Sequence, residues 1–183
     1  VLVLTMLFLL FSVISPAMAA TVTVGGPSGT YSTIADAVAA AASGDRIEVA
    51  AGVYTENVDP NGKDLDIVGA GPAVTILRPP ASGFGVVVYD QGENGTLQSI
   101  GVEPAVGERG IYILGSSPTI TNCRIEGAGD FDSTWGGAVS VSNGSPVFDS
   151  VEFTDNRGAK GGDLYIAAAS NVTLSNSTID RSS

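Results

Sequence analysis

Apolar and polar residues alternate with a period of two along most of the chain from residue 45 onward. Such alternation predicts short strands with one buried and one solvated face, and the Gly, Asn, Asp and Ser clusters between them predict turns. We expect six inward-facing pairs, which recur at steps of 18 to 28 residues, to stack as the rungs of one sheet. These pairs are Ile47/Val49, Leu65/Ile67, Val86/Val88, Ile111/Ile113, Val139/Val141 and Leu164/Ile166.

A second series of apolar pairs keeps a similar step, and the two members of each pair are five residues apart. The pairs are Leu97/Val102, Ile120/Ile125, Phe148/Phe153 and Leu174/Ile179. This spacing places the two residues on either side of a bend, so the series predicts two further faces. A nearly constant period of this size is typical of a solenoid, in which each coil buries its apolar face against its neighbours. The sequence therefore predicts an all-β fold, a parallel β-helix of about six coils over residues 45–183.

Polar residues keep the same step as these pairs. Ser99, Asn122, Ser150 and Asn176 occupy equivalent places in four successive coils. Serine and asparagine favour turns because their short side chains bond to nearby backbone groups. We therefore expect a corner at which these four side chains stack along the axis of the solenoid.

Residues 20–44 follow a different pattern, which predicts a strand over 21–24, a glycine-rich break over 25–29 and then one short helix. Ser32 or Thr33 is the expected N-cap of this helix. Its apolar face would consist of Ile34, Ala35, Val38, Ala39 and Ala42. Because the first coil of a solenoid otherwise exposes its apolar cross-section to water, we expect the helix to cap the β-helix.

The first 19 residues have the pattern of a secretory signal peptide. A continuous apolar run over 1–15 is followed by Pro16 and the small-residue sequence Ala17-Met18-Ala19. The run is shorter than the roughly 20 residues that a membrane-spanning helix needs, which favours cleavage over anchoring. We expect the mature protein to begin at Ala20, to be secreted or displayed at the cell surface, and not to insert into a membrane. The chain begins without an initiator Met or a basic segment, so we expect it to start inside the signal peptide.

Several segments of residues 30–71 resemble the opening of pectin-lyase-like proteins, which are right-handed parallel β-helices. The matching segments are TI at 33–34, AV at 37–38, GDRI at 44–47, GVYTENV at 52–58 and LDIVGAG at 65–71. This resemblance implies a right-handed fold, but it recurs in esterases, lyases and non-catalytic surface proteins. Further on, GGAV at 136–139 and FTDN at 153–156 resemble the repeats of polymorphic outer-membrane proteins, which are adhesin-like β-helices.

Composition argues against several functions. The net charge of −11 argues against binding to nucleic acid or to anionic lipid, both of which require clustered Lys or Arg. Histidine is absent from the sequence, which excludes Ser/His and Cys/His nucleophile pairs and histidine metal sites. Pectin methylesterases share the Gly-x-Tyr-x-Glu pattern of residues 52–56, but their downstream motifs have no match. The one cysteine, Cys123, allows no intrachain disulfide and is expected to be a small buried residue.

The segment 126–135 contains the main candidate site. Glu126, Asp130 and Asp132 supply oxygen ligands that suit Ca²⁺, and Phe131 and Trp135 can stack on a sugar ring. The same carboxylates also suit a paired-carboxylate glycosidase. The alternative is a solvated loop, because acidic residues are common in turns.

These patterns favour an exported, non-enzymatic β-helix module with a structural or adhesive role, whose partner is a polysaccharide or a component of a cell surface. The alternative is a polysaccharide-active enzyme that resembles a pectin or uronan lyase, an esterase or a glycoside hydrolase. We expect no cofactor other than the possible calcium. Only residues 180–183 follow the pair Leu174/Ile179, so no cap is predicted for the last coil. We therefore expect the β-helix to be truncated at its C-terminus and able to self-associate through this coil.

Overall fold

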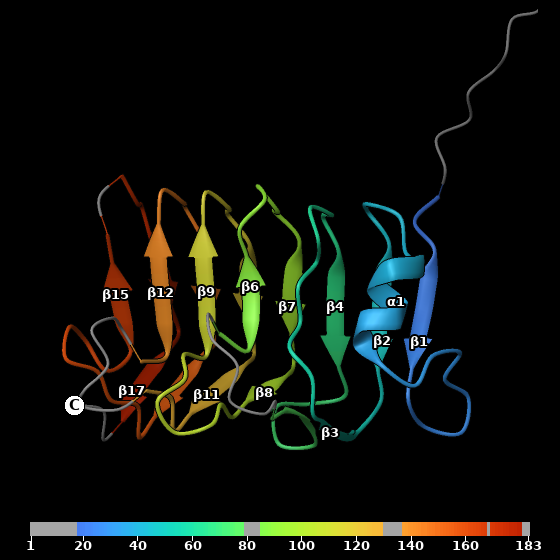
Figure 1. Ribbon diagram of the computed structural model, residues 1–183, viewed down its shortest axis with the longest axis horizontal. Helices are drawn as coiled ribbons and strands as arrows, with labels where there is room; N and C mark the ends of the chain where they lie inside the picture. Colours follow the sequence, from blue (N-terminus) through green and yellow to red (C-terminus); the bar gives the residue numbers. More distant parts are fainter. Residues whose placement is uncertain (1–17, 79–84, 130–136, 168, 181–183) are drawn as a thin grey trace, which may run out of the picture.

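The computed structural model describes residues 18–78, 85–129, 137–167 and 169–180, which form a rod of stacked coils (Figure 1). Seventeen strands in these ranges make three parallel sheets, which we call A, B and C. The predicted parallel β-helix of about six coils, with one short helix, is therefore confirmed. No helix in the described ranges is long and apolar enough to cross a membrane.

The strands of each sheet follow one another along the rod. Sheet A contains, in order, β1 (Thr21–Val24), β2 (Arg46–Val49), β4 (Asp66–Gly69), β7 (Thr96–Gln98), β10 (Thr119–Thr121), β13 (Val147–Asp149) and β16 (Thr173–Ser175). Sheet B contains β3 (Gly52–Tyr54), β5 (Thr75–Leu77), β8 (Gly101–Val102), β11 (Arg124–Glu126), β14 (Glu152–Thr154) and β17 (Thr178–Asp180). Sheet C contains β6 (Val87–Tyr89), β9 (Ile111–Leu114), β12 (Val139–Ser142) and β15 (Leu164–Ile166).

The register confirms the second predicted series completely. Leu97, Ile120, Phe148 and Leu174 are paired along sheet A, and Val102, Ile125, Phe153 and Ile179 are paired along sheet B. In the middle coils these side chains are fully buried, and the Phe148 and Phe153 rings lie 6.2 Å apart. Cys123 is also buried, as predicted.

The first predicted series is only partly correct. Its last three pairs do stack in sheet C, but Ile47/Val49 and Leu65/Ile67 belong to sheet A, where Ile47 pairs with Ile67. The first coil contributes only an isolated bridge, from Val58 to Val87, on the side of sheet C. The assignment of Val86/Val88 is also wrong, because Val87 and Tyr89 are the residues in register with Ile111 and Ile113.

The corner between sheets A and B contains the predicted polar column. Ser99, Asn122, Ser150 and Asn176 all have positive φ, between 49° and 58°. This left-handed conformation suits asparagine, whose side chain bonds locally. The Asn122 amide Nδ2 donates to Ser99 Oγ at 2.9 Å, which links neighbouring coils. Ser150 and Asn176 instead donate to the Asp149 carboxylate, so the predicted stacking is seen only in part.

The helix α1 (Ile34–Ala40) covers the first coil, as predicted, with Thr33 as its N-cap. The predicted apolar face is only partly correct, because Ile34 and Val38 are buried together with Ala37, whereas Ala35, Ala39 and Ala42 are exposed. Two charged side chains from the following coil hold its ends. Glu56 accepts hydrogen bonds at 2.9 Å from the N–H groups of Ile34 and Ala35, and Lys63 Nζ donates to the carbonyl oxygen atoms of Val38, Ala39 and Ala41. A carboxylate at the N-terminus and an ammonium group at the C-terminus both complement the helix dipole.

The segments GGAV (136–139) and FTDN (153–156) contain residues that join neighbouring coils. Asn156 is completely buried, and its Oδ1 accepts a hydrogen bond from Ala128 N at 2.9 Å. Its Nδ2 donates to Ile125 O and to Asp163 Oδ1, both at 3.0 Å. At Gly137 an added Cβ would lie 2.2 Å from the carbonyl oxygen of Arg157, so only glycine fits there.

The last coil is less well covered than the others. Ile166, Leu174 and Ile179 occupy inward positions, one in each sheet, yet they are 49%, 41% and 56% exposed. Their counterparts one coil earlier, Val141, Phe148 and Phe153, are fully buried. Self-association through this coil stays a prediction.

Candidate functional site

The outward-facing residues of sheet C form a row across its four strands. They are Val88 in β6, Tyr112 in β9, Ser140 in β12 and Tyr165 in β15, and the register pairs each with the next. Because neighbouring strands lie about 4.8 Å apart, the two tyrosines are about 10 Å apart along the rod. One small residue, Ser140, therefore lies between two aromatic side chains.

A hollow of about 310 Å³ follows this row, and we call it the sheet C hollow. Its lining residues are Arg109, Tyr112, Leu114, Ser140, Ser142, Tyr165 and Ala167. Ser140, which lies between the two tyrosines in the register, is only 5% exposed. The guanidinium carbon of Arg109 lies 5.4 Å from the centroid of the Tyr112 ring, within reach of a cation–π contact.

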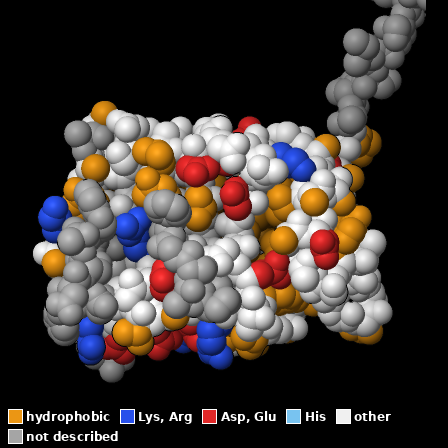
Figure 2. All heavy atoms as spheres, viewed as in Figure 1, with side chains coloured by type: hydrophobic (Ala, Val, Ile, Leu, Met, Phe, Trp, Pro, Cys, Tyr) orange, Lys and Arg blue, Asp and Glu red, His pale blue; other side chains and the backbone are white. Residues whose placement is uncertain are grey.

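The chemistry of this hollow suits a ligand that is apolar on its faces and polar at its edges. Tyr112 and Tyr165 offer aromatic surface with a polar end, Ser140 and Ser142 offer hydroxyl groups, and Arg109 offers donors. Figure 2 shows hydrophobic, acidic and basic side chains mixed on the face over sheet C. A sugar ring has this combination of faces and edges.

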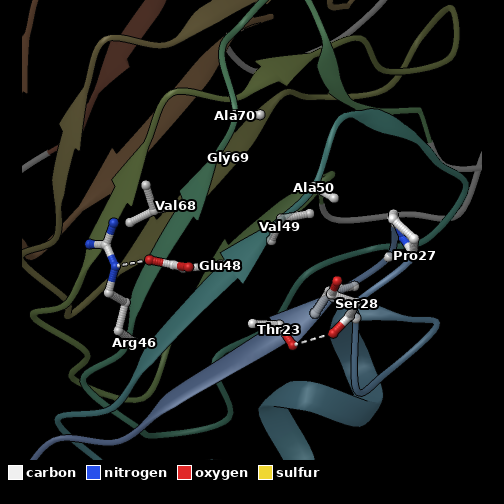
Figure 3. Close-up of a pocket in the computed structure, with 14 residues that line it drawn as sticks. Thr23, Pro27, Ser28, Arg46, Glu48, Val49, Ala50, Val68, Gly69 and Ala70 are labelled. Atoms are coloured by element: carbon white, nitrogen blue, oxygen red, sulfur yellow. Dashed lines mark hydrogen bonds and ion pairs between the residues drawn. The ribbon is translucent and has the colours of Figure 1, made fainter.

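A second hollow, of about 360 Å³, lies on the outer side of sheet A beside β1, β2 and β4 (Figure 3). The loop 25–29 forms one wall. Polar groups at its border already bond to one another, since Arg46 Nε lies 3.0 Å from Glu48 Oε1 and Thr23 Oγ1 donates to Ser28 O at 3.4 Å. This hollow has no aromatic lining residue, so we favour the sheet C hollow as the candidate binding site.

The predicted calcium and sugar-binding loop is described only at its first residue. Glu126 ends β11, and its carboxylate pairs with Arg124 Nη1 at 3.1 Å. Arg124 also contacts Glu103, which pairs with Arg78, so Glu126 belongs to a line of ion pairs on sheet B. Asp130, Phe131, Asp132 and Trp135 lie outside the described residues, and the predicted roles of these four residues are untested.

Another group of carboxylates does come together. Oxygen atoms of Asp59, Asp90 and Glu93 lie within 4.8 Å of one another, a geometry that can hold a cation. Both Glu93 oxygens are already acceptors, however, for the N–H groups of Gly62 and Gln91 and the hydroxyl of Ser116. Burial by itself raises the pKa of the Glu93 carboxyl, but these hydrogen bonds outweigh it and hold the pKa below its usual value. We therefore interpret Glu93 as a brace between coils.

The sequence prediction missed the sheet C hollow and this carboxylate group. A signal for the hollow was present, because Tyr112, Ser140 and Tyr165 lie between residues that were correctly assigned as inward-facing. Asp90 and Glu93 are three residues apart, but Asp59 lies in the preceding coil, 31 residues before Asp90. No local motif connects them.

The three stacked sheets and their polar corner define the class of the protein, a β-solenoid. Residues 74–183 match the model of the family described as the right handed beta helix region, and the chain therefore belongs to that family. The predicted right-handed parallel β-helix is confirmed by this match; the adhesin-like repeat stays a prediction.

Two solved structures of a pectin methylesterase from Aspergillus niger are similar to this chain. The penultimately deglycosylated form has 18% sequence identity and a TM-score of 0.44, and the deglycosylated form has 17% identity and a TM-score of 0.35. In both cases the match covers 92% of this chain and 88% of the esterase. No curated protein sequence matches the chain.

Proposed function

We propose that this protein is an exported, non-enzymatic β-helix module that works at the cell surface or outside the cell and binds a polysaccharide through the sheet C hollow. The row Tyr112, Ser140 and Tyr165 is the observation that carries this proposal. Two rings separated by a small residue offer stacking surface to successive sugar units, and the serine hydroxyls and Arg109 offer bonds to their edges.

The composition of the hollow supports binding rather than hydrolysis at this place. Glycoside hydrolases generally use a pair of carboxyl groups that flank the scissile bond. Among the residues that the structure describes, those that line the sheet C hollow include no carboxylate. A rigid sheet that presents aromatic side chains is instead suited to a pre-organised binding surface, since its parallel strands fix the positions of the rings.

The experiment is a binding screen on pectin, pectate, alginate and xylan, with turnover of each polymer measured in parallel. Tyr112→Ala and Tyr165→Ala should each weaken binding by about 3- to 10-fold, the size of one lost aromatic contact. Tyr112→Phe and Tyr165→Phe are the matched controls, because each keeps its ring, and these variants should bind nearly as well as the unsubstituted protein.

Equal binding by the unsubstituted protein and the double alanine variant would contradict the proposed site. Robust turnover of any of the four polymers would instead favour the alternative, a polysaccharide-active enzyme. Fractionation of the producing cells tests export, which requires the protein in the medium or at the cell surface.

A further inference from the structure

Within the described residues, which begin at residue 18, Ala20 is the first whose backbone N–H and C=O both bond to the β-helix. Its N–H donates to Asp45 Oδ1 at 2.7 Å, and its carbonyl oxygen accepts a hydrogen bond from Arg46 N at 2.8 Å. The residues before it, Ala19 and Met18, are exposed, Met18 to 92%. The backbone bonds to the β-helix therefore begin directly after the peptide bond between Ala19 and Ala20.

Asp45 is only 8% exposed and connects three elements at this point of the chain. Oδ1 binds Ala20, which precedes β1, and Oδ2 accepts a hydrogen bond at 2.8 Å from Ala42 N, just after α1. Asp45 itself directly precedes β2. The hydrogen bonds from Ala20 and Ala42, together with the charge of Lys63, hold the pKa of the Asp45 carboxyl below its usual value. The Asp45 carboxylate is thus charged at neutral pH, and its Oδ1 accepts the hydrogen bond from Ala20 N.

The predicted signal-peptide cleavage falls at this bond. We propose that Asp45 is the built-in acceptor for the new N-terminus, so that removal of the signal peptide converts the Ala20–Asp45 hydrogen bond into an ion pair that fastens β1 to the first coil. This inference rests on the export that forms part of the proposed function. It assigns Asp45 a role in maturation that is separate from the sheet C hollow.

The chemical step is hydrolysis of one peptide bond by a signal peptidase. One water molecule is consumed, Ala19 leaves with a carboxylate, and Ala20 keeps an α-amine that carries a proton at neutral pH. An unperturbed α-amino group has a pKa of about 7.7 to 8.0. A carboxylate within hydrogen-bond reach favours the protonated amine, so the pKa of the Ala20 amine should lie above that range.

The stability that the pair contributes depends on pH in a defined direction. Because the folded-state pKa of the amine is raised, the contribution is fully present below about pH 7.7 and is lost as the pH rises through the raised value. Among the neighbouring charged groups, the positive charge of Lys63 also favours the ionised form of the Asp45 carboxyl. The Arg46 side chain is paired with Glu48, and Asp64 Oδ1 accepts a hydrogen bond from Asn94 N.

The test begins with the full chain produced in an exporting host, with the N-terminus of the secreted protein read by mass spectrometry. We expect it to start at Ala20. The rate at which an amine-reactive reagent labels the α-amino group, followed against pH, gives the pKa of that group. Lys63 and Lys160 supply the only other amines of the processed chain, so the labelled sites are simple to separate. The pKa should be raised in the unsubstituted protein and ordinary in Asp45→Asn.

Acetylation of the α-amine provides the second measurement. It should lower the Tm of the secreted protein by about 2–4 °C, the response of a chain of this size to one such interaction, and leave the Tm of Asp45→Asn nearly unchanged. Glu152→Gln, which removes one exposed charge from β14, is the matched control and should respond like the unsubstituted protein. The hydrogen bond of Ala42 is altered equally in both forms of Asp45→Asn and cancels in this comparison.

An ordinary α-amino pKa in the secreted protein, an equal loss of Tm on acetylation in Asp45→Asn, or a different N-terminus would each overturn the inference. If Asp45→Asn does not fold, the titration of the unsubstituted protein decides by itself. Failure of the proposed function gives different results. Absent polysaccharide binding with a raised α-amino pKa refutes only the binding site, and an unprocessed chain that stays in the cell refutes export.

Discussion

Replacing Asn156 by alanine removes the side chain that joins two coils in the interior of the rod. The change leaves Ala128 N, Ile125 O and Asp163 Oδ1 without this partner in a place where Asn156 was completely buried. A buried polar group that loses its partner costs about 1–3 kcal/mol, so the two backbone groups alone predict a loss of about 2–6 kcal/mol in the free energy of unfolding. At about 2–4 °C per kcal/mol for a chain of this length, a loss of 3 kcal/mol lowers Tm by about 6–12 °C.

Urea and thermal unfolding followed by circular dichroism measure this effect. Asn171→Ala is the matched control, because Asn171 is exposed, and the change should fall within about 0.5 kcal/mol. The midpoint should shift with little change in the urea m-value, since the surface exposed on unfolding is nearly the same. Equal unfolding midpoints for Asn156→Ala and Asn171→Ala would refute the role of Asn156 as a fastener between coils.

Three further predictions follow from the packing and the charges. Phe153→Ala, at a fully buried position in contact with Phe148, should cost about 3–5 kcal/mol; an unchanged urea midpoint would contradict the inward register. Glu56→Ala removes the acceptor of two N–H groups at the start of α1. It should lower the free energy of unfolding by about 1–2 kcal/mol and speed amide hydrogen exchange in that helix. Unaltered exchange would contradict the stabilising role of Glu56 at the start of α1. Hydrogen bonds from Ser175 and Asn176 lower the pKa of the Asp149 carboxyl. The stability that Asp149 contributes is therefore present above the ordinary pKa of about 3.9 and is lost as the pH falls through the lower pKa of the folded state. Asp149→Asn should flatten the decline of Tm in that acid range, and an identical decline in both proteins would contradict this account.

The sequence was sufficient to predict the strands from β7 onward. In these coils a corner of two residues separates sheet A from sheet B, as at Ser99 and Ile100 between β7 and β8. Because this corner never changes length, the apolar residues on either side keep a constant offset and the register can be counted directly. The positive φ of the first corner residue explains why serine or asparagine stands there.

The same reasoning failed where the geometry departs from this regularity. The first coil has only the bridge at Val58 on the side of sheet C, so its strands were assigned to the wrong sheet. Residues 86–88 are three consecutive valines, and a pattern with a period of two contains no information about which of them face inward. The approach of Asp59, Asp90 and Glu93 depends on how successive coils are superimposed, which short-range patterns do not encode.

The fixed corner between sheets A and B also decides where this architecture can accept new sequence. From β7 onward that corner keeps its two residues, whereas the connections from sheet B to sheet C run over 103–110, 127–138 and 155–163 and differ in length. An insertion in these connections that keeps the contacts of Asn156 and Gly137 leaves the register of all three sheets intact and places the added residues at the border of sheet C. Homologous or engineered chains can therefore diversify the rim around Tyr112 and Tyr165 while the rod beneath it stays constant, much as variable loops are carried on an invariant scaffold.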